Sequence, residues 1–309
     1  MSVISRSQFH DEETAFEYLE GTLWPDGPVC PHCGTVGNST KLQGKATRIG
    51  VWKCKSKECR KQFTVKVGTV FEHGRMPLHK MLQAAYLMCC SKKGISAHQL
   101  HRILQISYKA AWFLAHRIRE GMRDGTLAPM GGGGAVVEAD ETYIGRLEGQ
   151  TKGHSGFAHK NAVLTLVERG GSARSFHIDN ASVASIVPII RDNVRRESRL
   201  MTDEARHYVA VGKQYRDHGA VEHGADEYVR GDIHANTVEG YYSIFKRGMK
   251  GIYQHCKEKH LHRYRAEFDF RYSNRVRLGV DDTARTAKAL QGMVGKRLTY
   301  RNPHVTAAE

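Results

Sequence analysis

The sequence has no run of about 18 apolar residues, the length that a membrane-spanning helix requires. Its N-terminal residues, MSVISRSQFHDEETAFEYLEG, also lack the apolar stretch of a secretory signal peptide. No basic segment has the apolar face with which a helix lies on a lipid surface. We therefore expect a cytoplasmic protein that does not bind membranes. Internal repeats and low-complexity tracts are absent too, and 309 residues are enough for two or three globular domains.

Acidic residues are in the minority. The chain has 47 Lys and Arg against 32 Asp and Glu, a formal net charge of +15. The excess lies in two windows, because residues 41–66 carry nine basic and one acidic side chain and residues 246–277 carry ten basic and three acidic ones. A basic field concentrated in two places is typical of a protein that binds a polyanion, and nucleic acid is the usual one. The charge pattern therefore predicts nucleic-acid binding.

Cysteine is scarce, with seven residues in the chain, and in a reducing cytoplasm these are not expected to form disulfides. Four of them form a C-x2-C and a C-x4-C motif with twenty residues between the two. Two such knuckles bring four thiolates together, the tetrahedral ligand set that zinc prefers. His32 lies inside the first knuckle and is an alternative ligand, although a solvated turn residue is its simpler role. The motifs predict one structural Zn2+ held by Cys30, Cys33, Cys54 and Cys59.

Residues 68–122 have the apolar spacing of helices throughout. A helix that Ser96 caps is expected to end near Leu104, and after a short turn a second helix begins at about Ser107. This is the length and turn spacing of a helix-turn-helix, although two ordinary packed helices would show the same pattern. On its polar side the second helix is expected to carry Lys109, His116, Arg117 and Arg119.

The glycines at 131–134, behind Pro129, predict a flexible joint and a domain boundary. No Gly-Lys-Ser/Thr follows them, which excludes a phosphate-binding P-loop. Beyond the joint the pattern changes to strands and helices, with a glycine-rich basic loop at 145–160 that we expect to be mobile. We predict a mixed sheet covered by helices, built from strands at 135–145, 161–171, 173–179 and 198–203, a helix at 182–194, short strands and loop up to Asp232, a helix at 234–253, and a last helix and polar tail after Arg277.

The predicted helix at 234–253 is amphipathic. At 3.6 residues per turn its polar residues form one stripe and its apolar residues form a separate face that can be buried. The helix is therefore suited both to anchoring a core and to presenting a site. The polar stripe contains Asn236, Glu239, Ser243 and Lys246, and the apolar face contains Val238, Tyr241, Phe245, Met249 and Ile252.

Three acidic residues fall on different elements of this region: Asp140 in the first strand, Asp203 at the end of the fourth, and Glu239 on the helix. If the first and fourth strands are neighbours, the helix packed across the sheet brings the three carboxylates together. Such carboxylates repel one another unless cations neutralise them, and oxygen ligands suit Mg2+ or Mn2+. We predict a site for two of these ions, suited to in-line attack on a phosphodiester, with Lys246 placed to contact phosphate.

Each of these acidic residues also has an ordinary structural interpretation. The segment EADET offers two further glutamates that compete with Asp140 for the role of ligand. Asp203 would serve as a helix cap, and Asn236 with Glu239 three residues later matches a capping box. A second metal site is an alternative interpretation of a later cluster, although its spacing is more typical of a solvated helix face. That cluster contains His255, Cys256, His260 and His262.

The segments EADETYIG, LMTDEARHY, HANTVEGYYSIFKRGMKGIYQH and EFDFRYSNR closely resemble the DDE transposases of bacterial insertion sequences. The resemblance is to the lineage that joins an N-terminal zinc ribbon to a ribonuclease-H-like (ISXO-like) catalytic domain, and it covers roughly residues 25–277 in matching order. It implies that Asp140, Asp203 and Glu239 bind the catalytic ions. It also implies that Lys246 is the basic residue that follows the glutamate in the motif of this family. This lineage often places an asparagine near the third acidic position, so Asn236 and Glu239 are both candidates for the third ligand.

The resemblance implies a DNA transposase that binds the terminal inverted repeats of an insertion sequence and double-stranded target DNA, and that cleaves and transfers strands with two Mg2+ or Mn2+ ions. Joining two ends implies at least a homodimer in the synaptic complex and a nucleoid-associated location. A catalytically silent DNA-binding regulator and a host nuclease of the same fold are the alternatives. We expect a multidomain α+β protein with an N-terminal helix (1–25), a zinc ribbon (26–70), a helical helix-turn-helix region (71–128), a Gly-rich linker (129–134), a ribonuclease-H-like α/β catalytic domain with a mixed sheet (135–277), and a C-terminal helix and tail (278–309).

Overall fold

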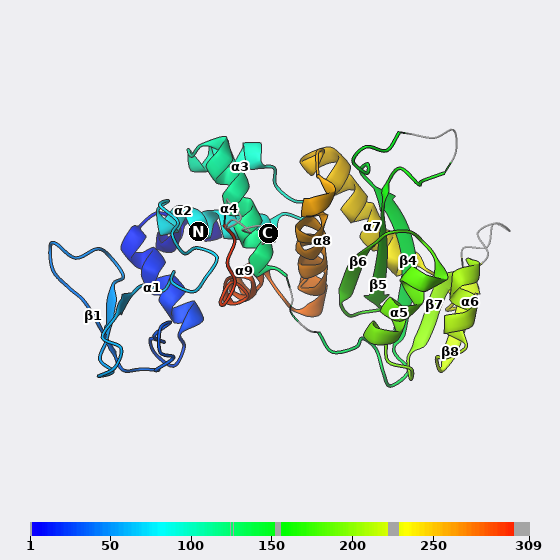
Figure 1. Ribbon diagram of the computed structural model, residues 1–309, viewed down its shortest axis with the longest axis horizontal. Coiled ribbons are helices and arrows are strands. Elements are labelled where there is room, and N and C mark those ends of the chain that lie inside the picture. Colours follow the sequence, from blue (N-terminus) through cyan, green and yellow to red (C-terminus); the bar gives the residue numbers. More distant parts are fainter. Residues whose placement is uncertain (1, 124, 126, 152–155, 222–228, 300–309) are drawn as a thin grey trace, which may run out of the picture. The chain divides into compact units, whose positions relative to one another are not determined.

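The computed structural model describes residues 2–123, 125, 127–151, 156–221 and 229–299. They divide into two compact units (Figure 1). The N-terminal unit contains residues 2–91, 95–123 and 282–299, and the sheet unit contains the described residues of 92–94 and 124–281. Three predicted segments lie partly outside the described residues: the loop at 145–160 through residues 152–155, the strand-and-loop segment through 222–228, and the polar tail through 300–309.

A small antiparallel sheet and one helix form the first part of the N-terminal unit. The Asp11 carboxylate accepts the N–H of Thr14 at 2.8 Å and so caps the helix, as expected of an Asp at that position. The helix packs closely on the turn before the second strand, because a Cβ at Gly50, where φ is +73°, would lie 2.1 Å from the ring of Phe16. The elements are the 3-10 turns η1 (Val3–Ser5) and η2 (Ser7–Phe9), the helix α1 (Glu12–Leu23), and the strands β1 (Ser39–Lys41), β2 (Trp52–Cys54) and β3 (Gln62–Phe63), in the order β1-β2-β3.

Two of the predicted helices have the ends that the sequence indicates. The helix α3 (Ala97–Leu104) begins with a capping box in which Ser96 Oγ accepts the N–H of Gln99 and Gln99 Oε1 accepts the N–H of Ser96. Gln105 adopts the left-handed conformation that ends a helix, with φ of 50°. After this turn Ser107 caps the helix α4 (Tyr108–Gly121).

The prediction of which residues lie on the polar side of α4 is wrong at two positions. His116 and Arg119 are only 1% and 2% exposed, whereas Lys109 near the start of the helix is exposed. The reason is that α4 packs against α2 (Leu78–Cys90) and against the C-terminal helix α9 (Asp282–Gln291), which returns to this unit. The spacing of polar and apolar residues along α4 does not show that a helix about 160 residues later in the chain packs against it.

The sheet unit contains the mixed sheet that the sequence predicts. Its strand order is β6-β5-β4-β7-β8, in which β5 is antiparallel to both of its neighbours, β4 and β6, and β7 and β8 are parallel to β4. Strand β5 is buried along almost its whole length, which fits its mostly apolar sequence. The strands are β4 (Val136–Ile144), β5 (Asn161–Glu168), β6 (Ala173–Ile178), β7 (Arg199–Asp203) and β8 (Asp217–Val221).

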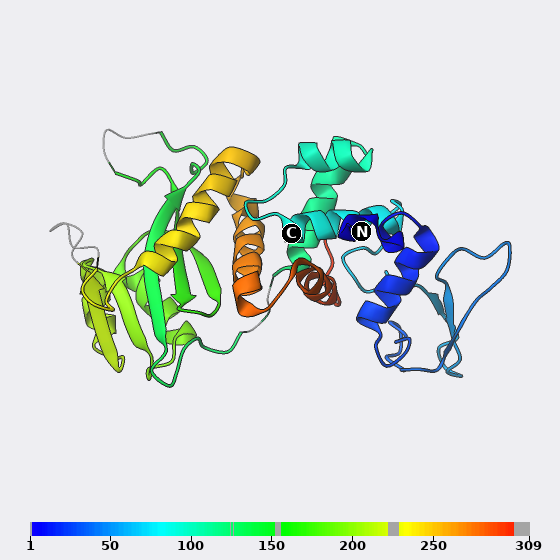
Figure 2. The same cartoon turned by 180° about the vertical axis from the view of Figure 1, so that it is seen from behind.

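Helices cover both faces of this sheet and enclose one core on each face (Figures 1 and 2). One core contains Ile186, Ile190 and Tyr208, from the helices α5 (Val183–Asn193) and α6 (Arg206–Gly212). The other core is formed by the amphipathic helix predicted at 234–253 and by the helix after it, gold and orange in Figure 2. These are α7 (Asn236–Gly248) with its π-helical extension η4 (Met249–Tyr253), and α8 (Glu258–Ser273), which the 3-10 turn η5 (Val276–Leu278) follows.

The glycine-rich segment is part of the sheet unit, so the expectation of a flexible joint at 129–134 is corrected. The N–H of Gly132 donates to Ser198 Oγ at 2.9 Å, and the N–H of Gly134 donates to the carbonyl of Glu197 at 3.2 Å. At Gly131, where φ is +75°, a Cβ would lie 2.2 Å from Ser198 Oγ, so this close approach requires glycine. The division between the units lies ahead of this segment, after residue 123.

No described helix is both long enough and apolar enough to cross a membrane.

Candidate functional site

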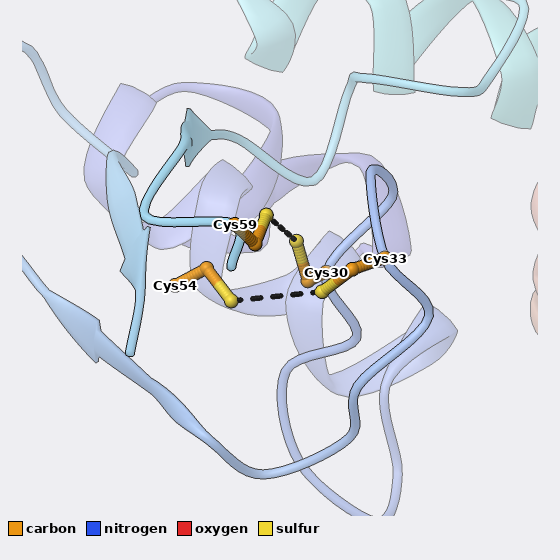
Figure 3. Close-up of side chains that lie close together, drawn as sticks. All are labelled: Cys30, Cys33, Cys54 and Cys59. Carbon is orange, nitrogen blue, oxygen red and sulfur yellow. Dashed lines mark hydrogen bonds between the residues drawn. The ribbon is translucent and has the colours of Figure 1, made fainter. Parts of the chain in front are cut away.

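The four predicted zinc ligands come together in the N-terminal unit (Figure 3). The sulfurs of Cys30 and Cys59 lie 3.7 Å apart, and so do those of Cys33 and Cys54. All four sulfurs lie within 4.8 Å of one another. A tetrahedral site with Zn–S bonds of about 2.3 Å spaces its sulfurs about 3.8 Å apart, so the cluster fits a structural zinc ion. His32 does not belong to the group.

The surroundings of these cysteines are partly apolar. Cys30 and Cys54 are fully buried against Phe63, and the rings of Trp24 and Trp52 pack edge to face beside them. Burial raises the pKa of Cys30 to about 11. A zinc ion would therefore displace a proton from this thiol and pair with the buried thiolate, which links its binding to the folding of the ribbon.

Two predicted acidic residues meet at the centre of the sheet unit. Strands β4 and β7 are parallel neighbours, as the prediction required, and their last paired residues are Glu138 and Met201. Asp140 and Asp203 each lie two residues further along, so the register brings them side by side. Carboxylate oxygens of Asp140, Asp203 and Glu141 lie within 4.8 Å of one another.

The third predicted ligand, Glu239, is not part of this compact group. It lies in the first turn of α7 with an exposed side chain, and its charge raises the pKa of Asp140. Asn236 is the first residue of the same helix and is also exposed. Lys246 lies two turns further along, with its ammonium 5.6 Å from the centre of the Tyr242 ring. The polar stripe of the helix thus stays accessible, as predicted.

The alternative interpretation of Asn236 and Glu239 as a capping box is wrong. The residue at the cap position of α7 is Ala235, not Asn236, and it makes no side-chain cap hydrogen bond. The carboxylate of Glu138 on β4 takes this place, because it accepts the N–H groups of Thr237 and Val238. Long-range packing therefore supplies the cap, and Glu138 is not available as a rival to Asp140 for metal.

Glu141 is the residue of this site that the sequence did not assign. Strand alternation places Asp140 and Glu141 on opposite faces, which in a fully paired strand would separate them. Here β4 continues to Ile144 after its pairing with β7 has stopped at Glu138, and carboxylate oxygens of both residues lie within 4.8 Å of one another. One oxygen of Glu141 lies 2.6 Å from Nε2 of His207 on α6. This contact raises the pKa of His207.

The charges of the site fit a divalent cation. Burial raises the pKa of Asp140 to about 7, and repulsion by Glu141, Asp203 and Glu239 adds to this effect. Cations such as Mg2+ bind carboxylate oxygens and would relieve the repulsion. Among the described residues, this group and the four cysteines are the clusters with the geometry for a metal ion. The cluster at residues 255–262 does not form one.

Asp140→Asn is expected to stabilise the protein in the absence of added Mg2+, and more at about pH 8 than at about pH 5. Because the folded-state pKa of Asp140 is raised from 3.8 to about 7, the folded state loses stability as the pH rises between these values. The uncharged asparagine avoids that loss, a gain of about 2 to 4 kcal/mol at high pH. Thermal unfolding followed by circular dichroism should show a midpoint about 5 °C higher at about pH 8. Glu204→Gln, a change at an exposed residue, is the control. An equal shift of the thermal midpoint of Asp140→Asn at both pH values would contradict the raised pKa of Asp140.

In comparisons with known proteins, one family model matches the part of the chain that holds each cluster. The family model described as an ISXO2-like transposase domain matches residues 131–273, which include Asp140, Asp203 and Glu239. The family model described as a transposase zinc-ribbon domain matches residues 10–62, which include the four cysteines. A protein of Halobacterium salinarum, described as an uncharacterized protein in transposable element ISH50, is 29% identical over 257 residues, which are 77% of this chain and 83% of that protein.

The two matched domains occur in the order that the sequence predicts, and together they span more than half of the chain. They confirm the resemblance to insertion-sequence transposases. The chain therefore combines a transposase zinc-ribbon domain with an ISXO2-like transposase domain, the pairing found in the insertion-sequence transposases that its sequence resembles.

Proposed function

We propose that this protein is a DDE-type DNA transposase that binds the terminal inverted repeats of an insertion sequence and catalyses metal-dependent strand cleavage and strand transfer. The observation that carries the proposal is the convergence of Asp140 and Asp203 from the adjacent strands β4 and β7 inside a transposase-family domain. The raised pKa of Asp140 supports it, because such a carboxyl is poised to exchange its proton for a cation.

In this proposal Asp140 and Asp203 hold two Mg2+ or Mn2+ ions, and Glu239 completes the set. Glu141 joins them as a further ligand or holds His207 beside the site. When bound, two such ions activate the attacking hydroxyl and stabilise charge on the leaving oxygen of a phosphodiester. Lys246, on the same face of α7 as Glu239, contacts phosphate and orients the DNA strand.

The sheet unit serves as a ribonuclease-H-like catalytic domain. Its mixed order β6-β5-β4-β7-β8 supports this assignment, with the acidic residues on the two central parallel strands. For cations in such a site to act on a phosphodiester, a DNA strand must lie against the end of the sheet where β4 and β7 separate. We propose that the basic residues that follow Glu239 along α7 and α8 line that path.

The N-terminal unit reads DNA ends. The helices α3 and α4 act as a helix-turn-helix, and the exposed N-terminal residues of α4, Tyr108 and Lys109, support this role because that end of a recognition helix contacts bases. The zinc ribbon contributes phosphate contacts through its lysines and arginines. Joining the two ends of an element requires at least a dimer of the protein in the synaptic complex.

One assay tests the proposed activity. The zinc-loaded protein is incubated with labelled element-end DNA, a target plasmid and Mg2+, and the products are separated by size. Joined products are the expected result, and they should disappear when Mg2+ is omitted. Hydrolysis without joining would indicate a host nuclease, and end binding without either reaction would indicate a silent regulator; both would overturn the proposal.

Glu239→Gln is expected to lower cleavage and joining by more than about 100-fold, whereas Asn236→Ala is expected to lower them by less than about tenfold. The reason is that the charge of Glu239 acts on Asp140, while Asn236 stands one turn earlier on the helix. Rates measured over a range of Mg2+ concentrations separate the two variants. If Asn236→Ala were the more damaging change, the asparagine would be the third ligand.

A further inference from the structure

The N-terminus of α7 is held by a side chain from the sheet, not by a residue of its own. Glu138 on β4 is fully buried, and its Oε2 accepts the N–H of Thr237 at 2.8 Å and the N–H of Val238 at 2.9 Å. Its Oε1 accepts the hydroxyl of Thr237 at 2.7 Å. The first N–H groups of a helix have no partner within the helix, and a negative charge there is favourable. Glu138 therefore binds the start of α7 to β4.

Arg169, just after β5, completes this arrangement. Its Nε donates to Glu138 Oε1 at 2.5 Å, so the buried carboxylate has a counter-charge. Its two terminal nitrogens donate to the carbonyls of Asp232 and His234, at 2.8 and 2.9 Å. One guanidinium thus joins the sheet to the chain segment that leads into α7. A lysine cannot make this set of contacts, because it lacks the planar fork of donors.

A second contact fixes α7 further along its length. The hydroxyl of Tyr242 donates to the backbone carbonyl of Asp140 at 2.5 Å. Strand β4 therefore holds α7 at two points: at residues 237–238 through Glu138 and at Tyr242 through Asp140. Glu239 lies on the helix between these points.

We propose that Glu138 and Arg169 are positioning residues that place Glu239 at the metal site formed by Asp140 and Asp203. This inference rests on the proposed function. Glu138 and Asp140 are two residues apart on β4 and share one face of the strand, so the strand itself sets the spacing between the anchor and the site. Glu138 cannot act as a ligand in their place, because its two oxygens already accept four hydrogen bonds.

The test measures Mn2+ binding to the zinc-loaded full-length protein without DNA. The concentration of free Mn2+ is monitored by electron paramagnetic resonance. Glu138→Gln keeps the shape of the side chain and removes the charge, and Arg169→Lys keeps the charge and removes the fork. Changes at residues that orient metal ligands typically cost 10- to 100-fold in affinity, so we expect about this loss for Glu138→Gln and a smaller one for Arg169→Lys. Affinity for element-end DNA should stay the same, and higher Mn2+ should restore cleavage.

Glu267→Gln is the matched control. Glu267 is also a fully buried glutamate of the sheet unit, and it pairs with Arg271 within α8. Its replacement should lower the thermal midpoint and leave Mn2+ affinity unchanged. An equal loss of Mn2+ affinity in this control would show that general destabilisation explains the effect, and the inference would fail.

Hydrogen exchange separates this inference from the proposed function. In Glu138→Gln the amides of Thr237 and Val238 should exchange at least about tenfold faster than in the wild type, because each loses a charged acceptor. If the wild type itself binds no Mn2+, the proposed function fails, and the exchange rates still decide whether Glu138 anchors α7. If the wild type binds Mn2+, unchanged Mn2+ affinity in Glu138→Gln overturns the inference, whether or not the two amides exchange faster.

Discussion

Asp203→Asn is expected to lower cleavage and strand transfer by more than about 100-fold while DNA-end binding stays within about twofold of the wild type. The loss should exceed the 10- to 100-fold that is typical of residues that only orient a ligand, because Asp203 would bind the ions directly. The prediction rests on the position of Asp203. It lies beside Asp140 in the parallel register of β4 and β7, and carboxylate oxygens of the two residues lie within 4.8 Å of each other. The rate of joining and the end-binding affinity should be measured on the same preparation.

The variant must be shown to fold. Asp203 Oδ1 accepts the N–H of Ala205 at 3.1 Å, and an asparagine oxygen can accept the same hydrogen bond, so the turn into α6 should survive. The thermal midpoint should fall little or even rise, since one carboxylate of a repelling group is removed. A folded Asp203→Asn protein that joins DNA at the wild-type rate would show that the site has been assigned to the wrong residues.

Cys54→Ser is expected to reduce the zinc content from about one ion per chain to none and to unfold the ribbon. Cys54 is fully buried in the small core with Cys30 and Phe63, so its loss removes a zinc ligand and leaves a polar group in an apolar place. Structural zinc contributes about 10 to 16 kcal/mol in isolated fingers, far more than three short strands can supply. Zinc content by elemental analysis, tryptophan fluorescence and end binding should all change together.

Cys256→Ser is the matched control for the ribbon. Cys256 lies in the sheet unit, outside the described metal clusters, and its sulfur donates to the carbonyl of Lys257 at 3.5 Å. This variant should keep about one zinc ion per chain and bind DNA ends normally. Zinc retained in Cys54→Ser, or lost in Cys256→Ser, would contradict the assignment of the four ligands.

Most elements of the sheet unit were predictable because their sequences are locally consistent. The helix at 236–248 shows a clear separation of polar and apolar residues, and the strand at 161–168 is mostly apolar. The cysteine spacing was equally informative, since two short knuckles can close around one ion without a large core. Local pattern was enough in each of these cases because the responsible residues are neighbours along the chain.

Other features depended on contacts that local pattern cannot encode. Asn236 and Glu239 have the spacing of a capping box, yet the cap of α7 is Glu138, nearly 100 residues earlier. His116 and Arg119 look like part of a polar helix face, yet neighbouring helices bury them. In both cases the energy of burying a distant partner outweighs the weak preference that the local sequence expresses.

The sequence by itself indicated the four cysteines that come together, most of the secondary structure and two members of the acidic cluster, Asp140 and Asp203, because these follow from residue type and short-range spacing. Only the tertiary structure decided which carboxylates meet. The parallel pairing of β4 with β7 brings Asp140 to Asp203, and the carboxylate of Glu141 lies within 4.8 Å of both. Glu138, which is fully buried and paired with Arg169, then holds the start of α7 against the strand that carries Asp140. Strand order and helix anchoring are set by long-range packing, and a one-dimensional pattern contains no record of which distant surfaces will be buried together.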